Sequence, residues 1–426
     1  MIAQIAQLRP EPRSKVKIAN RLVLTAVFTL SFVSYLTSDL SLALQFAPVV
    51  LFVLLVIFTV FFSASMVDAM ELLFAPESLL FVFFLSLLLI PASLASDVSL
   101  VFSLLLGTCL VFARLYMAVV PVSEVIEAFF WSGVISVAIF FPLAFSVLTA
   151  AIQSLSRFTA FSFHPNLLAF VLAGFLCVMV WKTLTGTWII KLLAAITGVI
   201  CCIIIFFTSS RGSIIGITIG CGLAGILFII HLPKQRRIKA SRWSFLFGTA
   251  ALTTVVFLSG AVWLDDTYDV VDKVLQITST DRGIDSGLTG RVDKWQETLK
   301  AMRDGSWLWG HGIRTSDSMS QLIDNSYVVA LYEVGLFPLA LICIRFVKVA
   351  WQFATRYLVS GHSEESINLV CVLLLTVFLL NNFVARYLFG IGNPYSFLAI
   401  LLFAAPTQKS NITPELSLSA QNSIAF

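Results

Sequence analysis

The sequence predicts an all-α, polytopic integral membrane protein with about twelve transmembrane helices. Of its 426 residues, 59% are hydrophobic and only 12% are charged, whereas soluble domains carry roughly 25% charged residues. Apolar runs such as 49–62 and 78–94 approach the roughly 20 residues that a helix needs to cross about 30 Å of hydrocarbon. This composition excludes a soluble enzyme, a disordered protein and a nucleic-acid binder.

The expected helices follow one another along the chain, separated by short polar breaks. Their approximate centres are residues 22–36, 42–62, 79–94, 98–119, 125–148, 166–181, 188–207, 214–230, 245–263, 327–347, 367–383 and 394–405. This divides the chain into residues 1–263 with the first nine helices, a large loop at 264–325, and residues 326–426 with the last three. Residues 1–21 lack a convincing cleavage site, which favours a retained first helix.

The basic residues give the expected topology. Those of the start and of the segment 232–244 fall on the same side once the crossings are counted, and the positive-inside rule makes that side the cytoplasm. Both termini are then cytoplasmic and the large loop lies outside. Three short external loops keep one basic residue each, namely Arg157, Arg211 and Arg386.

Two polar motifs stand at the external starts of expected helices. Arg157 precedes a His-Pro-Asn sequence with His164 and Asn166, although a proline at a first helical position is also ordinary helix-start chemistry. Arg211 lies in the Ser-Arg-Gly turn 210–212. It either snorkels to the interface or, together with the next helix N-terminus, holds an anion such as a pyrophosphate.

The large loop is expected to contain an amphipathic helix. The apolar residues that predict it share helical spacing and are Val292, Trp295, Leu299 and Met302, with Thr289 as the candidate cap. Residues 265–277 form a second, weaker candidate. Trp295 and Trp307 either pack this helix on the membrane or face sugar rings. His311, between two glycines, is either a solvated loop residue or a proton acceptor.

The tenth expected helix begins with Asp324, Asn325 and Tyr327 and contains Glu333. Asp324 suits an N-cap. Glu333, two turns into a spanning helix, needs a polar cavity or a partner such as an external arginine. The sequence carries no P-loop and no zinc motif, so we expect external chemistry without metal or cofactor. All seven cysteines fall inside apolar runs, which indicates no disulfide framework.

The order of these motifs resembles the O-antigen ligase and polymerase superfamily of bacterial envelope glycan assembly. The matching pieces are Arg157 before Pro165-Asn166, Ser210-Arg211-Gly212, Arg291 with Trp295, Gly310-His311-Gly312, Asp324-Asn325-Ser326-Tyr327, and Glu333 with Gly335. No single piece is specific, but their order and shared external side are.

The resemblance implies a GT-C-like glycosyltransferase on the outer face of the bacterial inner membrane, with a polyisoprenyl-pyrophosphate-linked glycan as donor. It makes Arg211 and Arg291 the ligands of the donor pyrophosphate, and Asp324 the group that positions or deprotonates the acceptor hydroxyl. The residues implied around the same cavity are Arg157, His164, Asn166, Trp295, His311, Arg314, Asn325, Tyr327, Glu333 and Arg386. Ligases of this pattern carry a histidine where this chain has Asp324, which favours a polysaccharide polymerase.

Two other functions stay open. A ligase would transfer the glycan to lipid A–core instead of to another repeat unit. A flippase or transporter of lipid-linked glycans would place ionisable residues near the bilayer midplane, whereas here they gather on the external side. Beyond the lipid-linked oligosaccharide and membrane lipid, the partners that the resemblance implies are a chain-length regulator and a flippase, with no nucleic acid.

Overall fold

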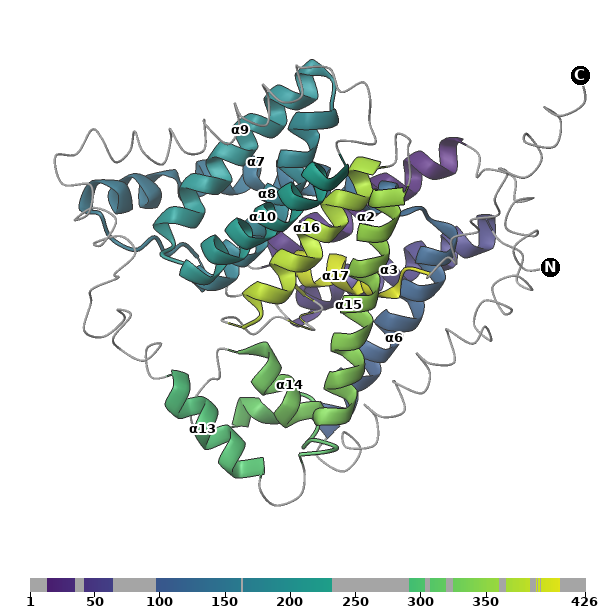
Figure 1. The fold of residues 1–426 in the computed structure, drawn as a ribbon, viewed down its shortest axis with the longest axis vertical. Coiled ribbons are helices and arrows are strands. Elements are labelled where there is room, and N and C mark those ends of the chain that lie inside the picture. The colour runs from purple at the N-terminus through teal and green to yellow at the C-terminus, as the bar shows by residue number, and fades with distance from the viewer. Residues whose placement is uncertain are drawn as a thin grey trace, which may run out of the picture.

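The protein is an α-helical membrane protein. The computed structural model describes residues 14–34, 42–63, 97–161, 164–231, 291–302, 307–318, 325–359, 365–383, 388, 390 and 392–406, and every regular element in these ranges is a helix (Figure 1). The α-helices are α2 (Ser14–Val33), α3 (Leu42–Ser63), α6 (Asp97–Val119), α7 (Val122–Ser154), α8 (Pro165–Thr185), α9 (Trp188–Phe207), α10 (Arg211–His231), α13 (Arg291–Ala301), α14 (Ser326–Val334), α15 (Leu336–Val359), α16 (Glu365–Asn381) and α17 (Pro394–Ala404). A short 3₁₀ helix, η4, covers Thr315–Ser318.

Six described helices are long and apolar enough to cross a membrane: α6, α7, α8, α9, α10 and α15. Shorter apolar helices lie at Ile18–Val33, Ala47–Val60, Ser366–Asn381 and Pro394–Ala404. Two expected helices, 79–94 and 245–263, lie outside the described residues. A total of about twelve spans and a GT-C-like arrangement therefore stay predictions.

The tenth expected helix, 327–347, is wrong as a single element. The chain breaks at Gly335, which has φ +84° and separates α14 from α15. The spanning segment begins only at Leu336. A left-handed residue cannot continue an α-helix, and glycine adopts that conformation without steric cost.

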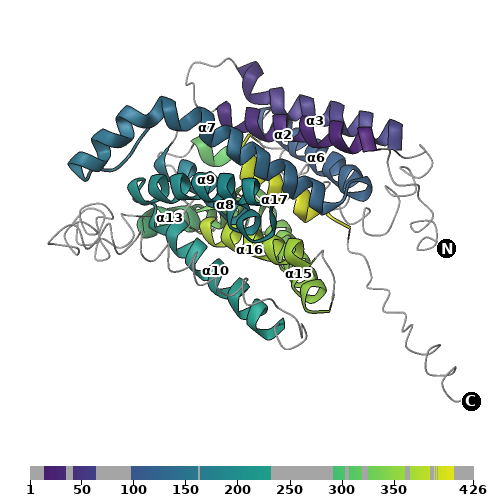
Figure 2. The same ribbon diagram turned by 90° about the horizontal axis from the view of Figure 1, so that it is seen from above.

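The centre of the molecule is the short helix α17, all of whose residues are buried. Its Phe397 packs on Phe28 of α2 and Phe52 of α3, with ring centroids 5.7 and 4.7 Å apart. Its Tyr395 contacts Phe170 of α8 at 4.9 Å and Phe378 of α16 at 5.5 Å. Figure 2 shows α17 between α2 and α7 on one side and α16 on the other. Aromatic side chains of several helices thus converge on one element.

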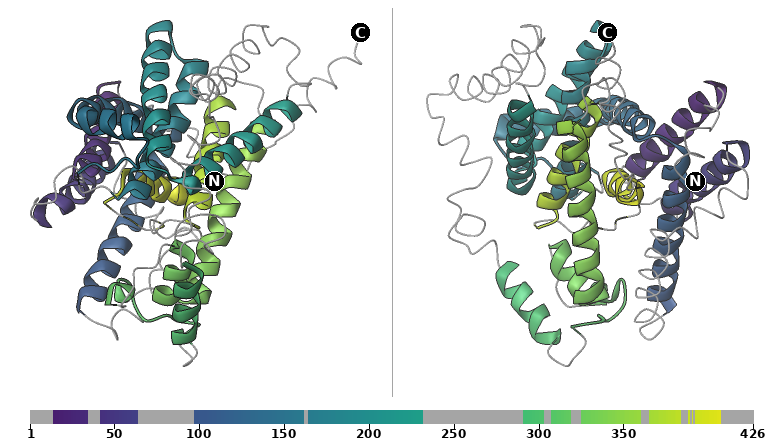
Figure 3. Two further views of the ribbon diagram at one scale, coloured as in Figure 1. Left: turned by 90° about the vertical axis from the view of Figure 1, so that its left-hand side faces the viewer. Right: turned by 45° about the vertical axis from the view of Figure 1, so that its right-hand side comes forward.

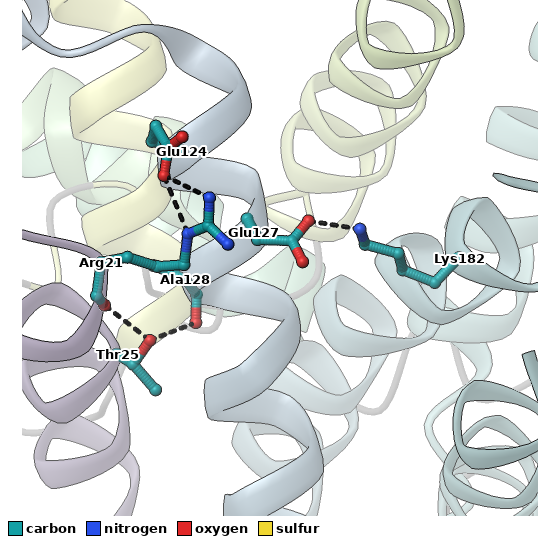
Figure 4. A network of polar contacts seen from close by, with 6 residues as sticks. All are labelled: Arg21, Thr25, Glu124, Glu127, Ala128 and Lys182. Atoms are coloured by element: carbon teal, nitrogen blue, oxygen red, sulfur yellow. Dashed lines mark hydrogen bonds and ion pairs between the residues drawn. The ribbon is translucent and has the colours of Figure 1, made fainter. Parts of the chain in front are cut away.

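One set of helix ends carries ion pairs, and we call it the charged end. Arg21 of α2 binds Glu124 of α7 at 2.7 Å, and Lys182 of α8 binds Glu127 of α7 (Figure 4). Thr25 of α2 also donates to the carbonyl of Ala128 at 3.4 Å. These contacts join the starts of α2 and α7 to the end of α8, which are three ends that the topology places on the same side of the membrane.

The elements of the large loop gather at one end of the molecule. Figures 1 and 3 show α13 and α14 beneath the main group of helices, where α15 reaches down to meet them. α13 confirms the amphipathic helix expected after position 289. Thr298 on α13 and Met302 just after its end are buried, whereas Leu299 is 46% exposed. Positions 295, 298 and 302 are adjacent on a helical wheel and position 299 lies at the edge of that face, so the buried face of α13 is narrower than the expected apolar stripe.

Candidate active site

Arg157 fastens three segments of the chain together. It follows α7, and its Nε donates to the carbonyl of Thr208 at 2.9 Å. Its Nη2 donates to Oδ1 of Asn166, in the first turn of α8, at 3.2 Å. The neighbouring amide of Phe158 donates to the carbonyl of Phe207 at 2.7 Å. Arg157 and Asn166, both singled out from the sequence, are therefore in contact and lie beside the end of α9.

His164 occupies the N-cap position of α8, with Pro165 as the first helical residue. The carbonyl of His164 accepts from the amides of Leu167 and Leu168 at 2.8 and 3.1 Å. Its side chain is exposed and makes no capping hydrogen bond. The structure thus gives the backbone of His164 the helix-start role that the motif also allowed.

Arg211 is the first residue of α10, three residues before the expected helix 214–230. Ser209 precedes it in the left-handed region with φ +57°, so the chain reverses sharply between α9 and α10. The half-buried guanidinium of Arg211 lies in this turn, and a cation at a helix start suits an anion. The amides of Arg211, Ser213 and Ile214 donate to the carbonyls of Ser209 and Ser210, so the turn itself uses most of the first amides of α10. Ser213, one turn into the helix, donates its hydroxyl to Oδ1 of Asn381 at 2.8 Å.

Asn381 and Asn382, which we call the amide pair, stand at the end of α16. Ser326, the first residue of α14, donates its hydroxyl to Oδ1 of Asn382 at 2.5 Å and its amide to the Asn382 carbonyl at 2.9 Å. The amide of Leu388 donates to the same Ser326 hydroxyl at 3.2 Å. The amide pair therefore joins the starts of α10 and α14.

Sequence reasoning missed the amide pair. The available signal was weak: two adjacent amides at the end of an apolar run, four to five residues before Arg386. Amides at such an end are ordinary, and only the fold shows that each accepts from a different helix start.

Asn325, and not Asp324, caps α14. The Oδ1 atom of Asn325 accepts from the amides of Tyr327 at 2.9 Å and Val328 at 3.1 Å, and its backbone is extended with φ −152°. The capping alternative for Asp324 is therefore wrong, because an N-cap is the last non-helical residue and α14 starts at Ser326. Asp324 itself, like Arg386, lies outside the described residues.

Tyr327 faces the end of α16. Its hydroxyl donates to the carbonyl of Leu379 at 2.8 Å, and its ring lies 4.6 Å from that of Phe383. Burial raises the pKa of this phenol, which keeps it a hydrogen-bond donor. Tyr327 thus adds a second attachment between α14 and α16.

The Gly-His-Gly segment locks onto the break between α14 and α15. The amides of His311 and Gly312 donate to the carbonyls of Tyr332 and Glu333 at 2.9 and 2.7 Å. The His311 ring stacks on Tyr332 with centroids 4.3 Å apart. A Cβ on Gly310 would come within 2.4 Å of the Glu333 carbonyl oxygen. The Gly-x-Gly and Glu-x-Gly motifs, 25 residues apart from Gly310 to Gly335, are thus two halves of one joint.

Glu333 is buried in this joint, with its carboxylate accepting from the hydroxyl of Ser316 in η4. It stands near the end of a nine-residue helix, so the expectation of an acid two turns inside a spanning helix is wrong. Arg314, in the left-handed region with φ +69°, places its guanidinium over the ring of Phe102 in α6 at 4.5 Å. The loop is therefore attached both to the joint and to α6.

The two tryptophans differ. Trp295 is partly buried on α13, and its indole Nε1 has no hydrogen-bond partner among the described residues. Trp307 is 46% exposed, and its carbonyl accepts from the amide of Leu336 at 2.8 Å. The backbone of Arg291 begins α13, and its side chain lies outside what the structure describes.

A family model described as O-antigen ligase matches residues 196–343, from α9 to α15. This segment of the chain is therefore similar to the O-antigen ligase family. A search of curated proteins finds no match. Members of the O-antigen ligase family are glycosyltransferase-like enzymes.

The O-antigen ligase segment contains the Ser-Arg-Gly turn, α13 and the joint around Gly335. Arg157, Asn166 and the amide pair lie outside it. Hydrogen bonds nevertheless tie the amide pair to two of its helix starts and Arg157 to the end of α9. Chemically, the arrangement offers a permanently charged guanidinium at one helix start and a second helix start capped by Asn325, both bound to the same end of α16, which can hold an anionic group and a polar acceptor.

Proposed function

We propose that this protein polymerises polyisoprenyl-pyrophosphate-linked oligosaccharide repeats into a surface polysaccharide. The observation that carries the proposal is the attachment of two helix starts within the O-antigen ligase segment to adjacent residues of the chain: α10, which begins with Arg211, and α14, which begins two residues after Asp324. Both are bound to the same end of α16. This shared attachment supports a site in which Arg211 binds the pyrophosphate and Asp324 accepts the proton.

The reaction needs a leaving group with its charge stabilised. The acceptor hydroxyl oxygen forms a bond to the anomeric carbon of the donor sugar, and the bond from that carbon to the pyrophosphate oxygen breaks. The hydroxyl proton passes to the Asp324 carboxylate, and the polyisoprenyl pyrophosphate leaves with the electron pair. Arg211 and Arg291 stay protonated and stabilise the developing charge. One preorganised donor of this kind contributes about 3 kcal/mol in the transition state.

Asp324 supports polymerisation over ligation. Ligases of this pattern place a histidine there, and an aspartate serves as the acceptor base when burial or hydrogen bonding raises its pKa. The proposed reaction takes place on the outer face of the bacterial inner membrane, and both termini face the cytoplasm. The basic segments at 9–21 and 234–242 support that topology.

The test is complementation of a bacterial strain that lacks its polysaccharide polymerase. Arg211→Ala, Arg291→Ala and Asp324→Asn are expressed at matched membrane levels, and polymer length is read on a gel. We expect single repeats outside the cell and a loss of polymer of roughly 100-fold. Matched controls are Lys348→Ala on α15 and Glu297→Gln on α13, both exposed, which should leave the polymer unchanged.

Long polymer in all three variants would overturn the site assignment. Supplying purified lipid A–core instead of repeat units tests the ligase alternative, since glycan transferred to that acceptor would replace the polymerase assignment. Repeats that accumulate inside the cell would indicate a flippase.

A further inference from the structure

The amide pair is buried and bound on every side. Asn381 is 1% exposed and Asn382 is not exposed. We infer that Asn381 and Asn382 are positioning residues, which set the starts of α10 and α14 at a fixed separation for transfer. This inference rests on the proposed function, and it concerns residues outside the segment that the family model matches.

The two contacts have the same construction. Asn381 accepts from Ser213, which lies two residues after Arg211. Asn382 accepts from Ser326, which lies two residues after Asp324. Each serine is in the first turn of its helix, two positions after a candidate catalytic residue. A shift of either amide would therefore move one candidate catalytic residue relative to the other.

The amide nitrogens determine which atoms face the serines. Asn381 Nδ2 donates to the carbonyl of Val377 at 2.9 Å, and Asn382 Nδ2 donates to the carbonyl of Phe378 at 2.8 Å. These bonds within α16 hold the nitrogens, so the Oδ1 atoms are presented outward. Only a side chain with both a donor and an acceptor completes this arrangement, and aspartate lacks the donor when ionised.

Close packing keeps α10 within reach of the amide pair. A Cβ on Gly216 would lie 2.9 Å from Asn381 Nδ2, and a Cβ on Gly220 would lie 2.6 Å from Cγ2 of Val377. Small residues allow membrane helices to approach each other this closely. The Ser213 to Asn381 hydrogen bond is thus built on a glycine face that runs along α10.

Fixed separation matters because transfer depends on alignment. A misplacement of about 1 Å at a reacting group costs roughly 100-fold in rate. Ser326 is bound to α16 twice, by the Asn382 side chain and by the Asn382 carbonyl. The Ser213 hydroxyl is bound to α16 by the Asn381 side chain, and its other partner, the Ser210 hydroxyl, lies in the same turn as Ser213. We therefore expect the α10 contact to be the more sensitive one to a single hydroxyl deletion.

The experiment compares full-length variants purified in lipid nanodiscs, with turnover expressed per folded molecule. Ser213→Ala and Asn381→Ala should each lower kcat by about 10-fold to 100-fold, with KM for the lipid-linked repeat changed by less than about threefold, because donor contacts stay in place. The double variant should lose less than the sum of the two single losses, since both changes remove the hydrogen bond between Ser213 and Asn381. Ser213→Ala also removes the contact from the Ser210 hydroxyl, and Asn381→Ala also removes the contact to the Val377 carbonyl. Ser213→Thr, which restores the hydroxyl, should recover most of kcat.

Thr218→Ala on α10 is the matched control, because this exposed hydroxyl binds the carbonyl of Ile214 in its own helix. A fall in folded yield with unchanged kcat per folded molecule would overturn the positioning role and leave a structural one. Additive losses in the double variant would also overturn it. A wild-type protein that makes neither polymer nor a ligated product would instead overturn the proposed function, and the positioning role with it.

Discussion

At the scale of single residues, one oxygen atom determines where α14 begins. Asn325 Oδ1 binds the amides of Tyr327 and Val328, which would otherwise lack intrahelical partners. Asn325, and not the neighbouring Asp324, is therefore the capping residue. We propose that the Asp324 carboxylate takes the proton of the acceptor hydroxyl, and this requires that it does not cap the helix, because a carboxylate bound to two backbone amides is a weaker base.

Replacing the cap tests this division. Asn325→Ala should lower the free energy of unfolding by about 0.5–2 kcal/mol, whereas Asn325→Ser should stay close to wild type because a serine hydroxyl also caps a helix. Thermal unfolding of the purified protein measures both. Thr355→Ala is the control, since this exposed hydroxyl binds the carbonyl of Trp351 in its own helix. Equal loss in the alanine and serine variants would contradict the capping role.

The sequence predicted site residues whose partners are near in the chain, and it missed those whose partners are far away. Arg157 and Asn166, which are nine positions apart and in contact, were both singled out from one motif. Ser213 with Asn381 is a contact across 168 positions. No local pattern encodes such a pair, because it depends on how α10 and α16 pack, and one sequence carries no information on that packing.

At the scale of elements, the joint between the loop and the bundle depends on two glycines. Gly310 and Gly335 have φ +75° and +84°, and each faces the backbone of the other segment. The apolar run 327–347 reads as one helix because its composition does not change across Gly335. Gly335 followed by Pro338 is nevertheless typical of a helix that ends and a new helix that begins, so the break could have been predicted from the sequence.

Alanine at either glycine should disrupt the joint. Gly335→Ala would bring a Cβ within 2.3 Å of the Leu308 carbonyl oxygen, and positive φ alone costs about 1–3 kcal/mol for a residue with a side chain. We expect a lower unfolding temperature and loss of polymer in the complementation assay. Gly222→Ala is the matched control, because a Cβ there meets nothing within 4 Å, and it should be neutral or slightly stabilising. Equal behaviour of the two variants would contradict the joint.

At the scale of the whole molecule, the helix ends fall into two groups with different chemistry. The charged end joins α2, α7 and α8 through ion pairs. The ends around the amide pair meet through neutral amides, hydroxyls and Arg157. Charge placement predicted the alternation of these ends, since a helix that crosses the membrane must reverse its direction each time. The apolar run 394–405 predicted α17 as one more spanning helix. It did not predict that these eleven residues, which rise only about 16 Å, lie at the centre of the molecule among aromatic rings.

The two ion pairs of the charged end should contribute unequally to the stability of the protein. Lys182 and Glu127 have side chains 11% and 15% exposed, whereas Arg21 is 39% exposed. Removing one partner of a buried pair costs about 3–5 kcal/mol, because the other charge is left without compensation, whereas an exposed pair contributes roughly 0–1 kcal/mol. Lys182→Met should therefore lower the unfolding temperature more than Arg21→Met. Glu127→Met combined with Lys182→Met should recover part of the loss, since no lone charge remains. Thermal unfolding of the wild type and these three variants in one detergent measures this. A double variant that is less stable than Lys182→Met alone would show that the attraction within the pair, and not the lone buried charge, determines the stability of this end.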